Sequence, residues 1–128
     1  MKKEFIPYEQ ALALKELGFD ENCFGLWNLN NGKYEVDIIG VCQYSKEFKY
    51  REVLAPLYQQ AFRWFREKYN YWSYVYPSIR NKTWHFHIQF YDSDMWGEMF
   101  LGENYTTYEE AELACLIKLI EIVKENKQ

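Results

Sequence analysis

The chain has 128 residues, a formal charge of −4 and an aromatic fraction of 20%, so it has the size of one domain and enough apolar surface to form a core. This composition excludes an intrinsically disordered protein, because disordered chains lack the apolar residues needed to offset the entropy of folding. No run approaches the roughly 20 apolar residues of a membrane helix, and we expect a cytoplasmic protein with no membrane contact. Three cysteines without a C-x-x-C pair favour a reducing compartment.

Charge is distributed unevenly along the chain. Residues 1–45 carry 4 basic and 7 acidic side chains, residues 46–82 carry 8 and 3, and residues 83–128 carry 3 and 9. A basic middle segment is typical of an anion-binding face, and it is equally typical of a segment that packs against acidic neighbours in the fold.

The first half of the chain predicts one helix and one hairpin. Pro7 suits the first turn of a helix, because its missing N–H lies where a helix donor is unpaired in any case. Residues 17–19 (Leu-Gly-Phe) are typical of a Schellman ending, in which glycine adopts a left-handed conformation. Strands are predicted over 24–29 and 33–42, because the Asn-Gly pair between them favours a tight hairpin turn.

The second half contains two further predicted helices. After a polar connection over 44–52, apolar residues from Leu54 to Tyr69 follow helical spacing, with Pro56 near the start. The run Thr107-Tyr108-Glu109-Glu110 matches a capping box, which predicts a last helix that continues to Val123.

Alternating aromatic segments between these helices predict strands over 72–79 and 83–91, and a weaker pattern predicts a third strand over 98–105. The predicted order is α-β-β-α-β-β-(β)-α over a single domain, residues 1–128. Because the strands come in consecutive hairpins, we expect an α+β fold with a mainly antiparallel sheet and helices largely on one face.

Three helical segments resemble a group of small proteins of Bacteroidota and of their phages and prophages. They are residues 5–19 (FIPYEQALALKELGF), 55–69 (APLYQQAFRWFREKY) and 107–125 (TYEEAELACLIKLIEIVKE). The resemblance covers roughly two-fifths of the chain and leaves out residues 70–105. It implies a bacterial or phage-infected cytoplasm and brings no known activity with it; short accessory proteins in that setting are more often binders or regulators than catalysts.

The predicted strand over 83–91 carries a candidate metal or catalytic site. Strand alternation places His85, His87 and Gln89 on one face and apolar residues on the other. Two imidazoles at this spacing can share a metal or act as acid and base, and Asp92, Asp94 and Glu98 follow as candidate oxygen ligands. The same pattern is also typical of an ordinary solvent-facing strand.

A second candidate site combines aromatic and basic residues. Trp72, Tyr74 and Tyr76 share a strand face, and Arg63, Arg66, Arg80 and Lys82 supply positive charge. Aromatic rings stack on bases and guanidinium groups match phosphate oxygens, so this set favours a nucleotide or a single nucleic-acid strand. The alternative is that these rings belong to the core and the arginines pair with the acidic last third.

Binding of duplex nucleic acid is not expected. Residues 54–123 share the α-β-β-β-α order of double-stranded RNA-binding domains, which place lysines at the start of their last helix. Here Glu109, Glu110 and Glu112 stand in that place and would repel phosphates. Cys23, Cys42 and Cys115 lie among apolar neighbours, so buried structural roles are expected for them.

No common catalytic or cofactor motif is present in the sequence, so no catalytic residue and no cofactor are assigned. Five tryptophans and twelve tyrosines favour a buried interface, because these residues are enriched there. We expect a non-enzymatic binding or regulatory module that contacts a partner protein or a second copy of itself. The alternatives are a protein that binds a signalling nucleotide and a metal-dependent hydrolase that uses His85 and His87.

Overall fold

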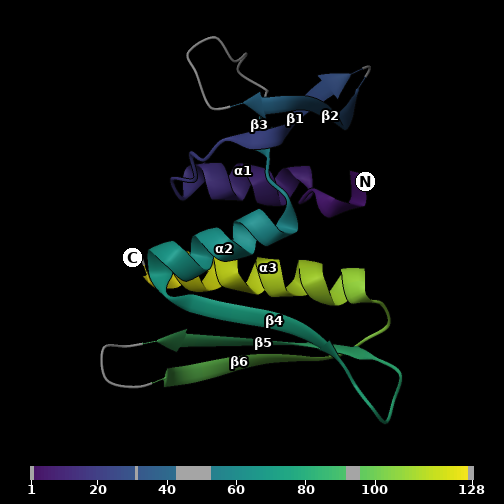
Figure 1. Cartoon of the computed structure of the whole chain (residues 1–128), viewed down its shortest axis with the longest axis vertical. Coiled ribbons are helices and arrows are strands. Elements are labelled where there is room, and N and C mark those ends of the chain that lie inside the picture. The colour runs from purple at the N-terminus through teal and green to yellow at the C-terminus, as the bar shows by residue number, and fades with distance from the viewer. Residues whose placement is uncertain (1, 31, 43–52, 92–95, 127–128) are drawn as a thin grey trace. The chain divides into compact units, whose positions relative to one another are not determined.

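The computed structural model describes residues 2–30, 32–42, 53–91 and 96–126. These residues form two compact units, residues 1–61 and 62–128, and the boundary between them falls inside helix α2 (Tyr58–Tyr69). Each unit is described by itself below (Figure 1).

The first unit is a three-stranded antiparallel sheet with one main helix. Its elements are η1 (Lys2–Glu4), α1 (Tyr8–Glu16), β1 (Cys23–Asn30), β2 (Lys33–Cys42) and β3 (Val53–Ala55). The strand order is β2-β1-β3. Gly32 has a φ of 80°, as the turn of the predicted β1–β2 hairpin requires.

Helix α1 ends as the sequence predicts. The Phe19 N–H donates to the Leu14 carbonyl over 2.9 Å, and the Gly18 N–H donates to the Lys15 carbonyl over 3.1 Å. Gly18 has a φ of 103°. This pair of bonds is the Schellman motif, and it directs the chain back over the last turn of the helix.

The start predicted for the second helix is wrong. Residues 53–55 form strand β3 and pair with β1, so that Leu54 lies opposite Leu26. All three residues of β3 are buried, and Pro56 separates the strand from α2, which begins at Tyr58. Leu54 matches helical spacing only because an inward-facing strand residue precedes the apolar stripe of the helix.

The second unit has the α-β-β-β-α order expected from the sequence. The remainder of α2 is followed by β4 (Tyr71–Pro77), β5 (Trp84–Tyr91), β6 (Trp96–Tyr105) and α3 (Tyr108–Asn126). The strands form an antiparallel sheet in the order β4-β5-β6, and α3 lies along one face of it (Figure 1). The α+β class and the antiparallel pairing are confirmed, with the strands divided between two sheets.

Helix α3 has the predicted cap in a slightly shifted form. The Thr107 hydroxyl accepts the Glu110 N–H over 3.1 Å, and the Glu110 carboxylate accepts the N–H of Thr106 over 3.2 Å. The second bond reaches one residue further back than the motif predicts. Both bonds satisfy donors where the helix begins, so the start of α3 is fixed by local chemistry.

The core of the second unit lies between α3 and the sheet. Phe86 and Ile88 of β5 are buried, and α3 contributes Leu116 and Leu119 to the same core. Within the described parts of the chain, no helix is long and apolar enough to span a membrane.

Gly102 of β6 makes room for the Phe86 ring on the facing strand. The two residues are partners in the β5–β6 register, and a Cβ atom built on Gly102 would lie 1.9 Å from Cε2 of Phe86. The ring therefore occupies the volume that any side chain at position 102 would need.

We expect Gly102→Ala to lower the free energy of unfolding by about 1–3 kcal/mol, because the Phe86 ring must leave its buried position. Urea unfolding followed by circular dichroism measures the change. The control is Leu101→Ala at the exposed neighbouring position, where a change within about 0.5 kcal/mol is expected. Equal stability of the parent and Gly102→Ala proteins would contradict this packing.

Candidate functional site

The face of the β4-β5-β6 sheet opposite α3 brings the two candidate sites together. In the antiparallel register, Tyr74 lies directly opposite His87 and Tyr76 lies opposite His85. Trp72, on the same face of β4, lies opposite Gln89. We call the surface formed by Trp72, Tyr74, Tyr76, His85 and His87 the ring face.

Neighbouring rings of the ring face contact one another across the strands. The Tyr74 hydroxyl and Nδ1 of His87 are hydrogen bonded. The rings of Tyr76 and His85 are stacked, with centroids 5.4 Å apart and an interplanar angle of 21°. The ring centroids of Tyr74 and Tyr76, which are neighbours along β4, are 5.5 Å apart. Such cross-strand pairs stabilise the sheet and hold each ring in a defined orientation.

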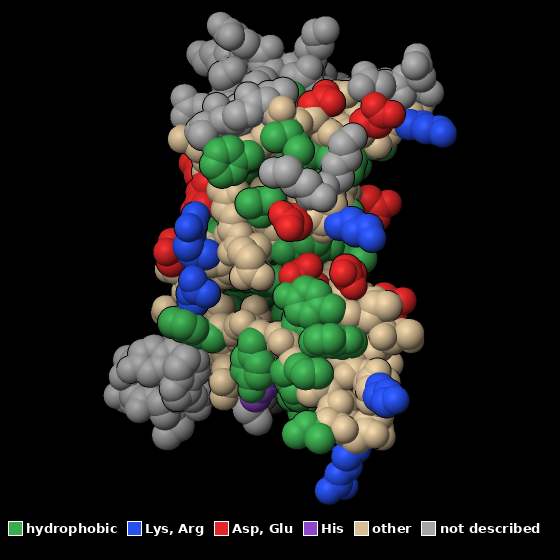
Figure 2. All heavy atoms as spheres, turned by 45° about the vertical axis from the view of Figure 1, so that its right-hand side comes forward, with side chains coloured by type: hydrophobic (Ala, Val, Ile, Leu, Met, Phe, Trp, Pro, Cys, Tyr) green, Lys and Arg blue, Asp and Glu red, His purple; other side chains and the backbone are tan. Residues whose placement is uncertain are grey.

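The ring face is open to solvent over much of its area. Trp72 is 45% exposed and Tyr74 is 50% exposed, and Leu101 of β6, opposite His87, is 56% exposed. Figure 2 shows part of a histidine side chain among hydrophobic side chains at the surface. The prediction that Trp72, Tyr74 and Tyr76 share a strand face is confirmed, and the alternative that they belong to the core is wrong for Trp72 and Tyr74.

Arg66, one of the candidate arginines, contacts the ring face. The Arg66 guanidinium of α2 lies over the Trp72 ring, 5.1 Å from its centroid, which is within the range of a cation–π interaction. Arg63 is exposed one turn earlier on α2, and Arg80 is exposed in the turn after β4. Arg66 and Arg80 therefore lie toward opposite ends of β4 and do not form one cluster.

The histidines lack a third metal ligand among the described residues. No group of three or more His, Cys, Asp or Glu side chains able to hold a metal occurs there. His87 already bonds Tyr74 through Nδ1. Asp92, Asp94 and the side chain of Glu98, which the sequence offered as oxygen ligands, lie outside the described residues. Among the described residues, the candidate ligands for a hydrolase metal are therefore His85 and His87.

Two groups in α3 are held in their neutral forms. Burial raises the pKa of the Cys115 thiol to about 12, although a hydrogen bond with Ser73 opposes this shift. Burial and the nearby Glu112 carboxylate raise the pKa of Tyr108 to about 12. Cys115 and Cys23 are buried thiols, as predicted, and Cys42 falls outside the described side chains. A thiol with such a pKa is a poor nucleophile at neutral pH.

The start of α3 differs from the duplex-binding pattern in a further way. Glu109 and Glu110 are exposed, whereas Glu112 is 7% exposed and faces the core beside Tyr108. Two of the three expected carboxylates therefore meet solvent here, and their charge disfavours phosphates at this end of the helix.

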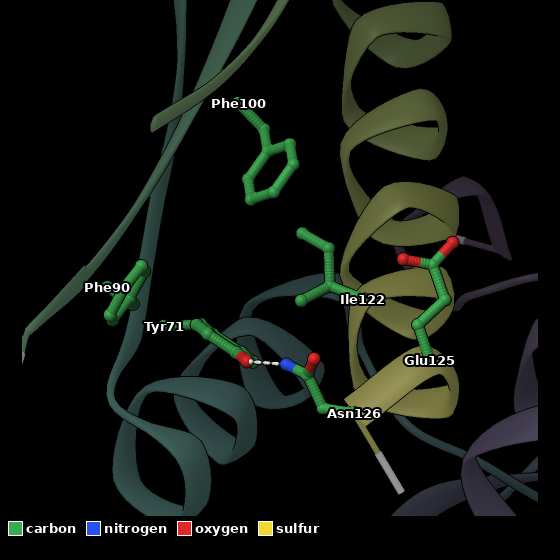
Figure 3. A pocket seen from close by; sticks show the side chains of 6 residues that line it. All are labelled: Tyr71, Phe90, Phe100, Ile122, Glu125 and Asn126. Atoms are coloured by element: carbon green, nitrogen blue, oxygen red, sulfur yellow. Dashed lines mark hydrogen bonds between the residues drawn. The ribbon is translucent and has the colours of Figure 1, made fainter. Parts of the chain in front are cut away.

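A pocket lies on the α3 side of the sheet, at the C-terminal end of the helix (Figure 3). It has a volume of about 290 Å³, and the Asn126 amide donates to the Tyr71 hydroxyl over 2.7 Å. Its lining residues are Tyr71, Phe90, Phe100, Ile122, Glu125 and Asn126. No sequence pattern indicates this pocket, because its walls come from segments far apart in the chain.

Two residues of the open sheet face were not assigned to the aromatic site from the sequence. Gln89 lies beside Trp72, and Leu101 adds apolar area next to His87. Alternation in the predicted third strand could have placed Leu101 on a solvent face, but not beside His87. That neighbour depends on the register between β5 and β6.

Because the folded state raises the pKa of Cys115 from 9.0 to about 12, the stabilisation from this neutral thiol is complete below about pH 9. It is lost as the pH rises toward 12, because the unfolded chain then releases the proton more readily. We expect the free energy of unfolding to fall over this range, and to fall less steeply in Cys115→Ala. Urea unfolding at stepped pH measures how steeply the free energy of unfolding falls with pH in the parent protein and in Cys115→Ala. Equal slopes in the two proteins would contradict a raised pKa of Cys115 in the folded state.

Comparison of the chain with protein-family models, with curated proteins and with solved structures gives no match.

Proposed function

We propose that the protein is a binding module and that the ring face is the surface with which it contacts a partner protein. The observation that carries this proposal is the union of both candidate clusters on one exposed sheet face. Large apolar surface exposed in this way is typical of interaction sites. Bacterial or phage origin and a regulatory role remain part of the proposal, and they rest on the resemblance described above.

The shape and composition of the ring face favour a macromolecular partner. Its rings are spread over two adjacent strands and paired side by side. Tyrosine and tryptophan offer large contact area together with a hydrogen-bonding group, and they cost little conformational entropy when they become buried. Leu101 extends the apolar area onto the third strand.

Charge near the ring face favours a partner with an acidic surface. Residues 62–91 carry five basic side chains and one acidic side chain, Glu67. Arg66 lies at the Trp72 end of the face, whereas Arg80 and Lys82 lie in the turn beyond Pro77. Acidic groups of a partner would therefore meet positive charge at both ends of the rings, which increases the rate of association.

We expect Trp72→Ala and Tyr76→Ala to weaken partner capture tenfold or more each, or about 1.4 kcal/mol. Immobilised protein is incubated with bacterial lysate, and each retained protein is quantified by mass spectrometry. The matched control is Phe24→Ala, which removes a ring that is 50% exposed on β1.

A partner retained by the parent and control proteins, and lost from both ring-face variants, supports the proposal. Its retention should also decrease as salt is raised, because charge contributes to the contact. Equal retention by all four proteins would show that the ring face is not the recognition surface.

A nucleotide is the second candidate ligand, supported by the Arg66 guanidinium over the Trp72 ring. An indole next to a guanidinium can stack a base and pair a phosphate. A thermal-unfolding scan with AMP, GMP and cyclic dinucleotides tests this function. A bound nucleotide should raise the midpoint by roughly 2–8 °C at a hundredfold excess over its Kd. The shift should vanish in Arg66→Ala and persist in Arg80→Ala; no shift in the parent protein would exclude these nucleotides.

A further inference from the structure

Strand β4 is an edge strand of the second sheet, and its outer side is regular and uncharged. It lies at one end of the order β4-β5-β6, and it pairs with β5 from Tyr71 to Pro77 without a register shift. No charged residue occurs between Tyr71 and Pro77. Natural edge strands are usually protected from pairing by lysines, bulges, prolines or short length. In β4 the single proline stands at the last position.

The other sheet edges in the described chain carry such protection. Strand β3 has only three residues, and β2 carries Lys33, Glu35 and Asp37 along its length. The β5–β6 ladder has two register shifts, and Asn104 in β6 has a left-handed φ of 66°. Among these edges, β4 is therefore the one suited to pair with another strand.

The hydrogen-bond pattern of the β4–β5 hairpin identifies the main-chain groups on the open edge. The Ser78 N–H donates to the Thr83 carbonyl over 2.7 Å. In an antiparallel ladder, hydrogen-bonded pairs alternate with pairs whose main-chain groups point away from each other. Ser78 and Thr83 therefore form a hydrogen-bonded pair. Because the register is unbroken, the main-chain N–H and C=O groups of Tyr76, Tyr74 and Trp72 also bond to β5. The N–H and C=O groups of Tyr71, Ser73 and Val75 therefore point to the open edge.

We propose that two copies of the protein associate through antiparallel pairing of β4 with β4, with Tyr74 on the two-fold axis. In this register Ser73 lies opposite Val75 of the second copy, and Tyr71 lies opposite Pro77. Each copy donates through Tyr71, Ser73 and Val75 and accepts through Ser73, Val75 and Pro77. Every outward main-chain group of β4 except the Tyr71 carbonyl then has a partner. That carbonyl lies opposite Pro77, which has no N–H to donate, at the last position of the strand.

The side chains of the ring face match this two-fold axis. Trp72 and Tyr76 lie two residues on either side of Tyr74 on the same strand face. Pairing about Tyr74 places Trp72 of each copy opposite Tyr76 of the other and the two Tyr74 rings side by side. Aromatic cross-strand pairs stabilise a sheet, and the result is a six-stranded sheet with one continuous aromatic surface.

Analytical ultracentrifugation over a wide concentration range, with the full chain, tests the association. The parent protein is expected to form a dimer. Val75→Pro is expected to be monomeric and folded, because it removes an outward N–H and leaves the bonds to β5 intact; circular dichroism checks the fold. Val75→Thr keeps the N–H and should remain dimeric. A parent protein that stays monomeric, or a dimer that persists in folded Val75→Pro, would overturn the proposal.

Disulfide cross-linking tests the register without depending on the proline variant. Cα atoms in a pair that is not hydrogen bonded are about 4.5 Å apart, within the range that a disulfide spans. Mild oxidation with oxygen and a copper catalyst should therefore cross-link two copies of Tyr74→Cys. Tyr76→Cys should stay uncross-linked, because its partner is Trp72, and the parent protein reports any linkage through its own cysteines. Cross-linking of Tyr76→Cys without that of Tyr74→Cys would exclude this register.

The outcomes separate this proposal from recognition by the ring face. Val75→Pro leaves Trp72, Tyr76, His85 and His87 in place, so it should still capture a partner bound by those rings. A monomeric parent protein that captures another protein through the β4 edge, and loses it in Val75→Pro, would show that the edge binds a different chain and would overturn self-pairing.

Discussion

The alternation of side chains along β5 is the constraint on which the second unit depends. Phe86 and Ile88 must enter the core beneath α3, so His85 and His87 are placed on the opposite face by the two-residue period of a strand. The hairpin register then sets the side chains of β4 beside them. Burial on one side of the sheet thus determines the composition of the other side, and the ring face follows from core packing together with pairing.

The same sheet separates the unit into two chemically different sides. Helix α3, with its exposed Glu109 and Glu110, covers one side, and the open side carries rings with Arg66 at one end. Buried Cys115 and half-buried Tyr108 are kept neutral on the helix side, as is typical of side chains with a structural role. Chemistry able to recognise another molecule is concentrated on the open side and, through the main chain of β4, along one edge.

Local signals in the sequence were sufficient for several elements. Leu17-Gly18-Phe19 specifies a helix end and Thr107 specifies a helix start through bonds between near neighbours in the chain. Apolar spacing does not reveal strand β3, because the pattern continues without a break into α2. The strand conformation of Leu54 depends on pairing with Leu26, almost thirty residues away. The sequence predicts the histidine and aromatic clusters as two separate sites, because alternation gives the face of a residue within its strand but does not show which strand lies beside it.

The strand orders of the two sheets also bear on how each sheet forms. In β4-β5-β6 every strand pairs with its neighbour in the chain, whereas β1 must pair with β3 across the whole of β2 and the segment that follows it. Closing a longer loop costs more chain entropy before any contact forms, and sheets with more distant pairings fold more slowly. We therefore expect the β4-β5-β6 sheet to appear first in refolding, with docking of β3 onto β1 as the slower step of the first unit.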